Sequence, residues 1–310
     1  MVSNFHIRYL VHYDAAAVSL FPIIVKMSSF SFINTLKNTL FVASKTDIAS
    51  LNIASNLVRN FEWKPIQSHR NEIKSIQTLL GNTVYLWLIN EPLLHLNDIP
   101  NLFSSDISSI HEECAQLTDI IFLSRHAASS GTLSLTVHPI GIPWMVDSST
   151  VGGIPGKCSP PNPRISSLYR SLLREVKLHD VGSKYQVSLE ATHHGPYVGL
   201  PACFVEIGST EREWGDDEAG LIWSQCLAKE FKFPPPNISS TSTIASSSTT
   251  SAPITVDQED LSLEELDNDG KNNVVVISIG GGHYVPKMND LVISYYFKRK
   301  YIKLNKKLLL

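Results

Sequence analysis

The chain has 310 residues, of which 43% are hydrophobic, so it is long enough to bury the core of one large α/β domain or of two smaller domains. Its formal net charge of -3 excludes a protein that binds nucleic acid through bulk positive charge, and any contact with phosphates would need a local basic patch. The four cysteines form no CxxC pair, which argues against a zinc ribbon or a disulfide framework and favours a reducing compartment.

Residues 1–38 are predicted to be an N-terminal extension. Residues 15–25 are almost wholly apolar, but they include Pro22 and are too few to span a bilayer. Residues 27–46 contain no acidic side chain, which is typical of an organellar transit peptide, although arginine is missing there. The alternative is an untidy upstream start, with the folded part beginning at Met27 or later.

Buried strands and one helix are predicted for the first third of the folded part. Residues 39–43 predict the first strand, residues 44–47 suit a turn with a helix N-cap, and residues 48–57 predict a helix with an imperfect apolar face. Residues 84–89 predict a second buried strand, and residues 107–117 predict a helix.

Two further strands end in polar residues. Residues 120–123 form a continuous apolar run that ends in Ser124, Arg125 and His126. Residues 133–137 alternate between apolar and polar side chains and end at His138. Residues 142–163 are rich in proline and glycine and predict a long loop, and such loops inside compact domains are often lids or binding loops.

Residues 164–179 predict the clearest helix, because six apolar side chains recur at helical spacing along one stripe. Arg170, Arg174 and Lys177 fall together on roughly the opposite face. This cationic stripe is either the solvated side of a surface helix or a contact surface for a phosphate backbone.

A half-buried strand over residues 185–189 leads into a turn that carries His193 and His194 and ends in Gly195-Pro196. Residues 202–208 predict a buried strand with one carboxylate, Glu206. Because an unpaired buried charge costs about 3 kcal/mol or more, Glu206 is expected to meet a cation, a metal ion or a histidine, or to point out of the core.

The last third contains a helix, an insertion and a strand. Thr210 and Glu213 have the spacing of a capping box, and the acidic residues at 216–218 predict the first turn of a helix that continues to Lys229. Residues 234–270 are predicted to be a disordered insertion, because they are rich in proline, serine, threonine and acids and have little to bury. Residues 274–279 predict a buried strand of the same sheet.

That strand runs into Gly280, Gly281 and Gly282, followed by His283 and Tyr284. A glycine triplet lets the backbone approach a ligand and can turn its amides toward an anion, although a tight turn is the simpler explanation.

Histidines therefore follow or close several predicted strands: His126, His138, the pair His193 and His194, and His283. If the sheet is mostly parallel, these strand ends meet at one edge and share a pocket. Neutral imidazoles with a carboxylate, Glu206 or Glu190, suit Zn²⁺ with an open position for water, which can attack a carbonyl. Neighbouring strand residues face opposite ways, so two consecutive histidines can share a metal ion only if the backbone turns between them. No HExxH sequence is present, so a zincin-type protease is not supported.

Five ordered motifs resemble the D-aminoacyl-tRNA deacylases of the archaeal and plant type. They are Ser124-Arg125-His126, Leu135-Thr136-Val137-His138-Pro139, Glu190-Ala191-Thr192-His193-His194-Gly195-Pro196, Glu206-Ile207-Gly208-Ser209-Thr210 and Gly280-Gly281-Gly282-His283-Tyr284. The resemblance implies an α/β fold of three layers, with helices on both faces of a sheet, like that of phosphorylases or peptidyl-tRNA hydrolases. It also implies zinc dependence and hydrolysis of the ester that joins a D-amino acid to tRNA.

With this resemblance, the candidate site residues take roles. We predict catalytic roles for His194, His283, Thr192 and Thr136, and metal binding for His138, His193 and Glu206. We predict that substrate is contacted by Arg125, His126, Gly280, Gly281, Gly282 and Tyr284, with tRNA phosphates held by Arg170, Arg174 and Lys177.

The expected organisation is an extension over 1–38, a catalytic domain over 39–290 with the insertion at 234–270, and a basic tail over 291–310. The tail does not resemble the family, which predicts a truncated product. We expect a monomeric cytoplasmic enzyme with no membrane partner and no obligate protein partner; targeting to an organelle through the extension is the alternative location. The alternative functions are another metal- or phosphate-dependent hydrolase or phosphorylase on the same fold, and an inactive truncated isoform that binds tRNA.

Overall fold

The structure is a computed structural model that describes residues 23–26, 38–107, 117–143, 149–179, 184–236 and 274–277. The chain divides into two compact units, one made of residues 1–34 and 239–282 and the other of residues 35–238 and 283–310. In the first unit, strands β1 (Ile23–Lys26) and β12 (Val274–Ile277) pair antiparallel. The strand predicted over 274–279 is therefore present as β12, but it pairs with β1 and not with the large sheet.

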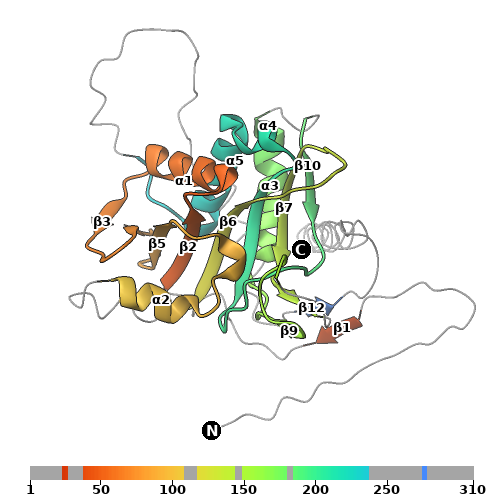
Figure 1. The fold of residues 1–310 in the computed structure, drawn as a ribbon. Helices are drawn as coiled ribbons and strands as arrows, with labels where there is room; N and C mark the ends of the chain where they lie inside the picture. The colour runs from red at the N-terminus through yellow and green to blue at the C-terminus, as the bar shows by residue number, and fades with distance from the viewer. Residues whose placement is uncertain are drawn as a thin grey trace, which may run out of the picture. The chain divides into compact units, whose positions relative to one another are not determined.

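A mixed sheet of eight strands forms the centre of the second unit (Figure 1), in the order β10-β7-β11-β6-β2-β5-β4-β3. Its strands are β2 (Asn38–Ser44), β3 (Lys64–Ile66), β4 (Glu72–Gln77), β5 (Thr83–Ile89), β6 (Asp119–Arg125), β7 (Ser134–Pro139), β10 (Gln186–Leu189) and β11 (Ala202–Gly208). Strands β5, β2, β6 and β11 run parallel, whereas β7 runs antiparallel to β11 and β10 runs parallel to β7. A short pair, β8 (Gly141–Ile142) with β9 (Lys157–Cys158), lies outside this sheet.

Helices cover both faces of the sheet, which confirms the predicted three-layer α/β class. One face packs against α1 (Ile48–Asn60), α3 (Ile165–Leu178), α4 (Glu211–Trp214) and α5 (Asp217–Phe231). The other face packs against the 3-10 turn η2 (Leu93–His95) and α2 (Ile99–Asp106). Alternate residues of β2 supply the two cores, since Phe41 belongs to the first and Leu40 and Val42 to the second. Among the described residues, none of the helices has the length and apolar character that a membrane span requires.

Polar groups start the helices where the sequence predicts them. The Asp47 side chain accepts the N–H of Ser50 at the start of α1, and the Asp216 side chain accepts the N–H of Glu218 at the start of α5. The capping box of Thr210 and Glu213 opens α4, as predicted.

The structure differs from the predicted elements in two places. The hairpin of β3 and β4 was not predicted, because its strands are short and half exposed and show little apolar alternation. The helix predicted over 107–117 lies mostly in residues 108–116, which are outside the described part, and the described helix α2 ends before it at Asp106. Most of the predicted insertion and all of residues 278–310, with the Gly280–Tyr284 motif, are also outside the described part.

Candidate functional site

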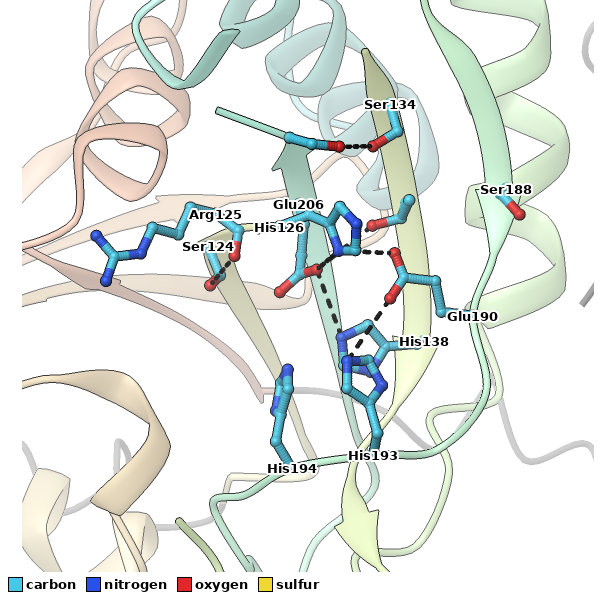
Figure 2. Close-up of polar contacts among 12 residues, drawn as sticks. Ser124, Arg125, His126, Ser134, His138, Ser188, Glu190, His193, His194 and Glu206 are labelled. Atoms are coloured by element: carbon cyan, nitrogen blue, oxygen red, sulfur yellow. Dashed lines mark hydrogen bonds and ion pairs between the residues drawn. The ribbon is translucent and has the colours of Figure 1, made fainter. Parts of the chain in front are cut away.

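The face of the sheet that carries α2 is apolar over β5 and β2 and becomes polar toward β7 and β10. On β7, Ser134, Thr136 and His138 alternate with Leu135 and Val137, which belong to the core on the opposite face. The same face receives polar side chains from four neighbouring segments, all of them buried, and Figure 2 labels most of them. They are Ser124, His126, Ser134, Thr136, His138, Ser188, Glu190 and Glu206.

Strand register, and not a shared strand edge, brings these residues together. Strands β7 and β10 run opposite to β6 and β11, so the predicted meeting of parallel strand ends is wrong for this half of the sheet. Instead β11 lies between β6 and β7, and Glu206 faces Ser124 on one side and Thr136 on the other. His138 lies opposite Phe204, within the span of β11. The pocket is therefore built across the face of the sheet.

Three imidazoles form the first part of the site. The ring centroids of His138 and His193 are 4.4 Å apart, those of His138 and His194 are 4.9 Å apart, and those of His193 and His194 are 4.2 Å apart. One nitrogen from each ring lies within 4.8 Å of the others. His194 has a φ of 48°, in the left-handed region, so the backbone turns between the two consecutive histidines as a shared ligand would require.

All three rings use Nδ1 for a bond to a backbone carbonyl: His138 to Pro139 at 2.9 Å, His193 to Ala191 at 2.7 Å and His194 to Gly195 at 2.9 Å. A carbonyl only accepts, so Nδ1 must carry the proton and donate it. In the neutral rings the lone pair is then on Nε2, the arrangement found in metal-binding histidines.

A layer of carboxylates supports the imidazoles. His126 Nδ1 lies 3.1 Å from Glu190 Oε1 and 3.6 Å from Glu206 Oε2. Glu206 Oε2 is also 3.6 Å from His138 Nε2, and Glu190 Oε2 is 3.7 Å from His193 Nε2. Dashed lines in Figure 2 trace these contacts, which alternate between imidazole and carboxylate. Glu206 thus meets histidines, as the sequence predicts for a buried acid.

Burial and neighbouring charges set the protonation states. Burial disfavours the ionised form of Glu206, but His138 and His126 outweigh it and hold the pKa of Glu206 well below its ordinary value. Burial also disfavours the charged forms of His126 and His138, yet Glu206 and Glu190 raise the pKa of both rings. For His194, burial and the neighbouring His138 and His193 lower the pKa to about 3, so this ring is neutral near pH 7.

An aromatic wall joins the site to the apolar core. The Phe204 ring stacks on His138 at a centroid distance of 5.2 Å and meets His194 edge-on at 4.9 Å. Its other contact is Phe122, stacked at 4.8 Å. Phe204 therefore fixes two of the three imidazoles with the same ring that fills the core.

The predicted site residues fall into four groups. His126, Thr136, His138, His193, His194 and Glu206 are brought together, and Thr192 lies half-buried in the turn before His193. Arg125 is exposed and points away from the imidazoles (Figure 2). Arg170, Arg174 and Lys177 lie on α3, which packs on the opposite face of the sheet. Gly280, Gly281, Gly282, His283 and Tyr284 are outside the described part.

The sequence prediction gave too little weight to Glu190, which contacts both His126 and His193, and missed Ser124, Ser134 and Ser188. The available signal was the period of two. Each of these residues stands two positions from another polar residue within a strand whose alternate positions are apolar.

Comparisons with known proteins identify the family. A family profile described as D-aminoacyl-tRNA deacylase matches residues 114–303, which is more than half of the chain. The chain belongs to the D-aminoacyl-tRNA deacylase family. The match includes most of the segment over 291–310 that the sequence analysis had placed outside the resemblance.

Individual relatives carry the same family name. A D-aminoacyl-tRNA deacylase of Arabidopsis thaliana is 29% identical over 266 residues, which cover 83% of this chain and 71% of that protein. One from Thermococcus onnurineus is 27% identical over 288 residues, which cover 87% and 83%. Among solved structures, the crystal structure of a conserved protein of unknown function matches with a TM-score of 0.53 and 27% identity, over 64% of this chain and 64% of that chain.

Proposed function

We propose that this chain hydrolyses the ester bond between a D-amino acid and the terminal ribose of tRNA, releasing the free amino acid and the tRNA. The observation that carries the proposal is the convergence of three Nε2 atoms in a buried polar pocket, in a chain that belongs to this deacylase family. Discrimination in favour of the D-amino acid is taken from the names of the relatives alone.

The residues of the pocket fit a zinc ion. His138 is fully buried, and its Nε2 has no hydrogen-bond partner among the described residues, which is costly unless something else binds it. Three nitrogen donors with Nδ1–H groups tied to carbonyls are the ligand set of many catalytic zinc sites. His138, His193 and His194 would hold the ion, and zinc, when bound, would lower the pKa of a water molecule and polarise the ester carbonyl. The geometry favours His194 as a ligand over its predicted catalytic role, and Glu206 as the support behind His138.

The protein groups around this triad supply orientation. An aminoacyl ester is an activated acyl group, so the enzyme mainly has to position water and stabilise the oxyanion. Glu206 holds a proton at Nδ1 of His126 and accepts the Thr136 hydroxyl at 3.4 Å, so both side chains are fixed at the edge of the pocket. Thr192 is proposed to orient the substrate at the turn. His283 and the amides of Gly280, Gly281 and Gly282 keep their predicted roles as part of the proposal.

The tRNA body requires a contact outside the pocket. Arg174 and Lys177 are exposed on α3 and Arg170 is half-buried. The sequence places all three on the side of the helix away from its apolar stripe, so we keep them as the proposed phosphate contact. The alternative of a phosphorylase is not favoured, because the family profile and the relatives named above are deacylases.

The decisive experiment measures release of free amino acid from D-aminoacyl-tRNA and from its L counterpart by the purified chain. Turnover of the D substrate, its loss with a chelator and its recovery with added Zn²⁺ are expected. Nucleoside phosphorolysis is measured in parallel and is expected to be absent. No turnover of D-aminoacyl-tRNA in the presence of Zn²⁺ would contradict the proposal.

The cellular setting is part of the proposal. We propose a monomer in the cytoplasm, consistent with the free thiols of Cys158, Cys203 and Cys226 among the described residues. Light scattering of the purified chain and imaging of a C-terminally tagged copy test the two statements.

A further inference from the structure

Arg125 is an exposed cation beside the buried pocket. It closes strand β6 between two buried residues, Ser124 and His126, and its guanidinium points away from the imidazoles (Figure 2). Its Cζ lies 5.0 Å from the ring centroid of Trp214, so the flat cation rests on the indole. Among the described residues Arg125 forms no salt bridge with a carboxylate. One face of the guanidinium is therefore supported by the indole and its charge is not neutralised by an ion pair.

Trp214 is held in place and is connected to the pocket. Its indole Nε1 donates to the carbonyl oxygen of His126 at 2.9 Å, and its own carbonyl accepts from Asn52 Nδ2 at 3.0 Å. The ring is half-buried and packs against the core formed with α1 and α5. The same His126 lies 3.1 Å from Glu190 through Nδ1. The pair Arg125 and Trp214, here called the Arg–Trp platform, is thus one residue away from the imidazole–carboxylate network.

The surroundings of the platform favour a flat ligand over a phosphate. The Asp47 carboxylate accepts the N–H of Ser50 at the start of α1 and the N–H of Arg125, at 3.0 and 3.1 Å. These amides, which would otherwise attract an anion, already have an acidic partner. A guanidinium plane, in contrast, is a common stacking partner for unpaired nucleobases in single-stranded RNA.

We propose that the Arg–Trp platform stacks an unpaired nucleobase of the single-stranded 3′ end of tRNA while the ester enters the imidazole pocket. The inference rests on the proposed function, because it assigns a contact to the same substrate. The base adjoining the ester is the terminal adenine, so this is the base that the platform holds.

Direct binding tests the platform without requiring turnover. Fluorescently labelled CCA trinucleotide and the same oligonucleotide with an abasic terminal ribose are titrated by anisotropy into the wild-type chain, Arg125→Lys and Arg59→Lys. Arg125→Lys keeps the charge and loses the planar stacking surface. Arg59→Lys is the matched control, since Arg59 is an exposed arginine on α1 that pairs with Asp217.

The wild-type chain and Arg59→Lys are expected to bind CCA roughly tenfold more tightly than the abasic oligonucleotide, about 1.4 kcal/mol and within the range for one stacked base. Arg125→Lys is expected to bind the two equally. With D-aminoacyl-tRNA, Arg125→Lys should raise KM and leave kcat within about twofold, which a general loss of structure would not do.

Equal binding of the two oligonucleotides by the wild type, or an unchanged preference in Arg125→Lys, would overturn the platform. These outcomes leave hydrolysis by the wild type intact. Preference for CCA without any hydrolysis would instead refute the proposed function and retain the platform as a nucleotide-binding site.

Discussion

The substitution Glu206→Gln tests the electrostatics of the pocket in the protein without metal. Gln has almost the same shape as Glu, but it removes a carboxylate that is 2% exposed and lies 3.6 Å from both His126 and His138. Removing one member of a buried ion pair costs about 3–5 kcal/mol. Glu190 remains 3.1 Å from His126 and compensates in part, so we expect a loss near the lower end, about 3 kcal/mol.

The pH dependence of this loss follows from the directions of the pKa shifts. The pKa of Glu206 is lowered in the folded chain, so its contribution is complete above the ordinary value of 4.5 and disappears as the pH falls through the folded pKa. The pKa values of His126 and His138 are raised, so their contributions are complete below 6.5 and disappear as the pH rises through the folded values. The destabilisation is therefore greatest between about pH 4.5 and 6.5.

Urea denaturation in the presence of a chelator measures the effect at pH 5.5 and at pH 8.5. The difference in unfolding free energy between the wild type and Glu206→Gln should be about 3 kcal/mol at the lower pH and clearly smaller at the higher pH. Glu72→Gln is the control, since Glu72 is 46% exposed and pairs with Lys74 at the surface, and it should change the free energy by less than about 1 kcal/mol. A difference that is constant with pH, or below about 0.5 kcal/mol at pH 5.5, would refute the proposed charge pairing.

Three further predictions concern binding and packing. His193→Ala should weaken Zn²⁺ binding at least about 100-fold in competition with a chromophoric chelator, whereas the exposed His69→Ala should leave it unchanged; equal affinities would remove the imidazole triad as the metal site. Phe204→Ala should destabilise the chain by about 3–5 kcal/mol in urea denaturation, because it deletes a fully buried ring, and a loss below about 1 kcal/mol would contradict this packing. Charge reversal of Arg174 and Lys177 should weaken tRNA binding and reduce the slope of log affinity against log salt by about one per lost phosphate contact, and an unchanged slope would exclude the α3 stripe.

The layered fold could be predicted from the sequence, because its central strands are short continuous apolar runs and its helices carry polar caps. Strands β2, β5, β6 and β11 and helices α1, α3 and α5 all formed near their predicted positions. The hairpin of β3 and β4 could not be predicted in this way, since strands at the edge of a sheet bury only a few side chains.

The members of the site were easier to predict than its geometry. Histidines next to apolar runs, and a carboxylate inside one, identified His138, His193, His194 and Glu206. The direction of β7 could not be read from its residues, because alternation is the same for parallel and antiparallel strands. The tautomers of the imidazoles depend on backbone carbonyls that only the folded chain brings into place.

The position of β11 has a consequence for how the chain reaches its native state. Strands β6 and β7 are neighbours in sequence, yet β11, more than sixty residues further along the chain, lies between them. Until β11 inserts, two long strand edges have no partner in this half of the sheet and are open to pairing with other molecules. The nascent pocket also lacks both its central acid and its aromatic wall during that interval. An ion that needs the finished pocket can therefore reward only the last step of assembly, by mass action on the completed sheet.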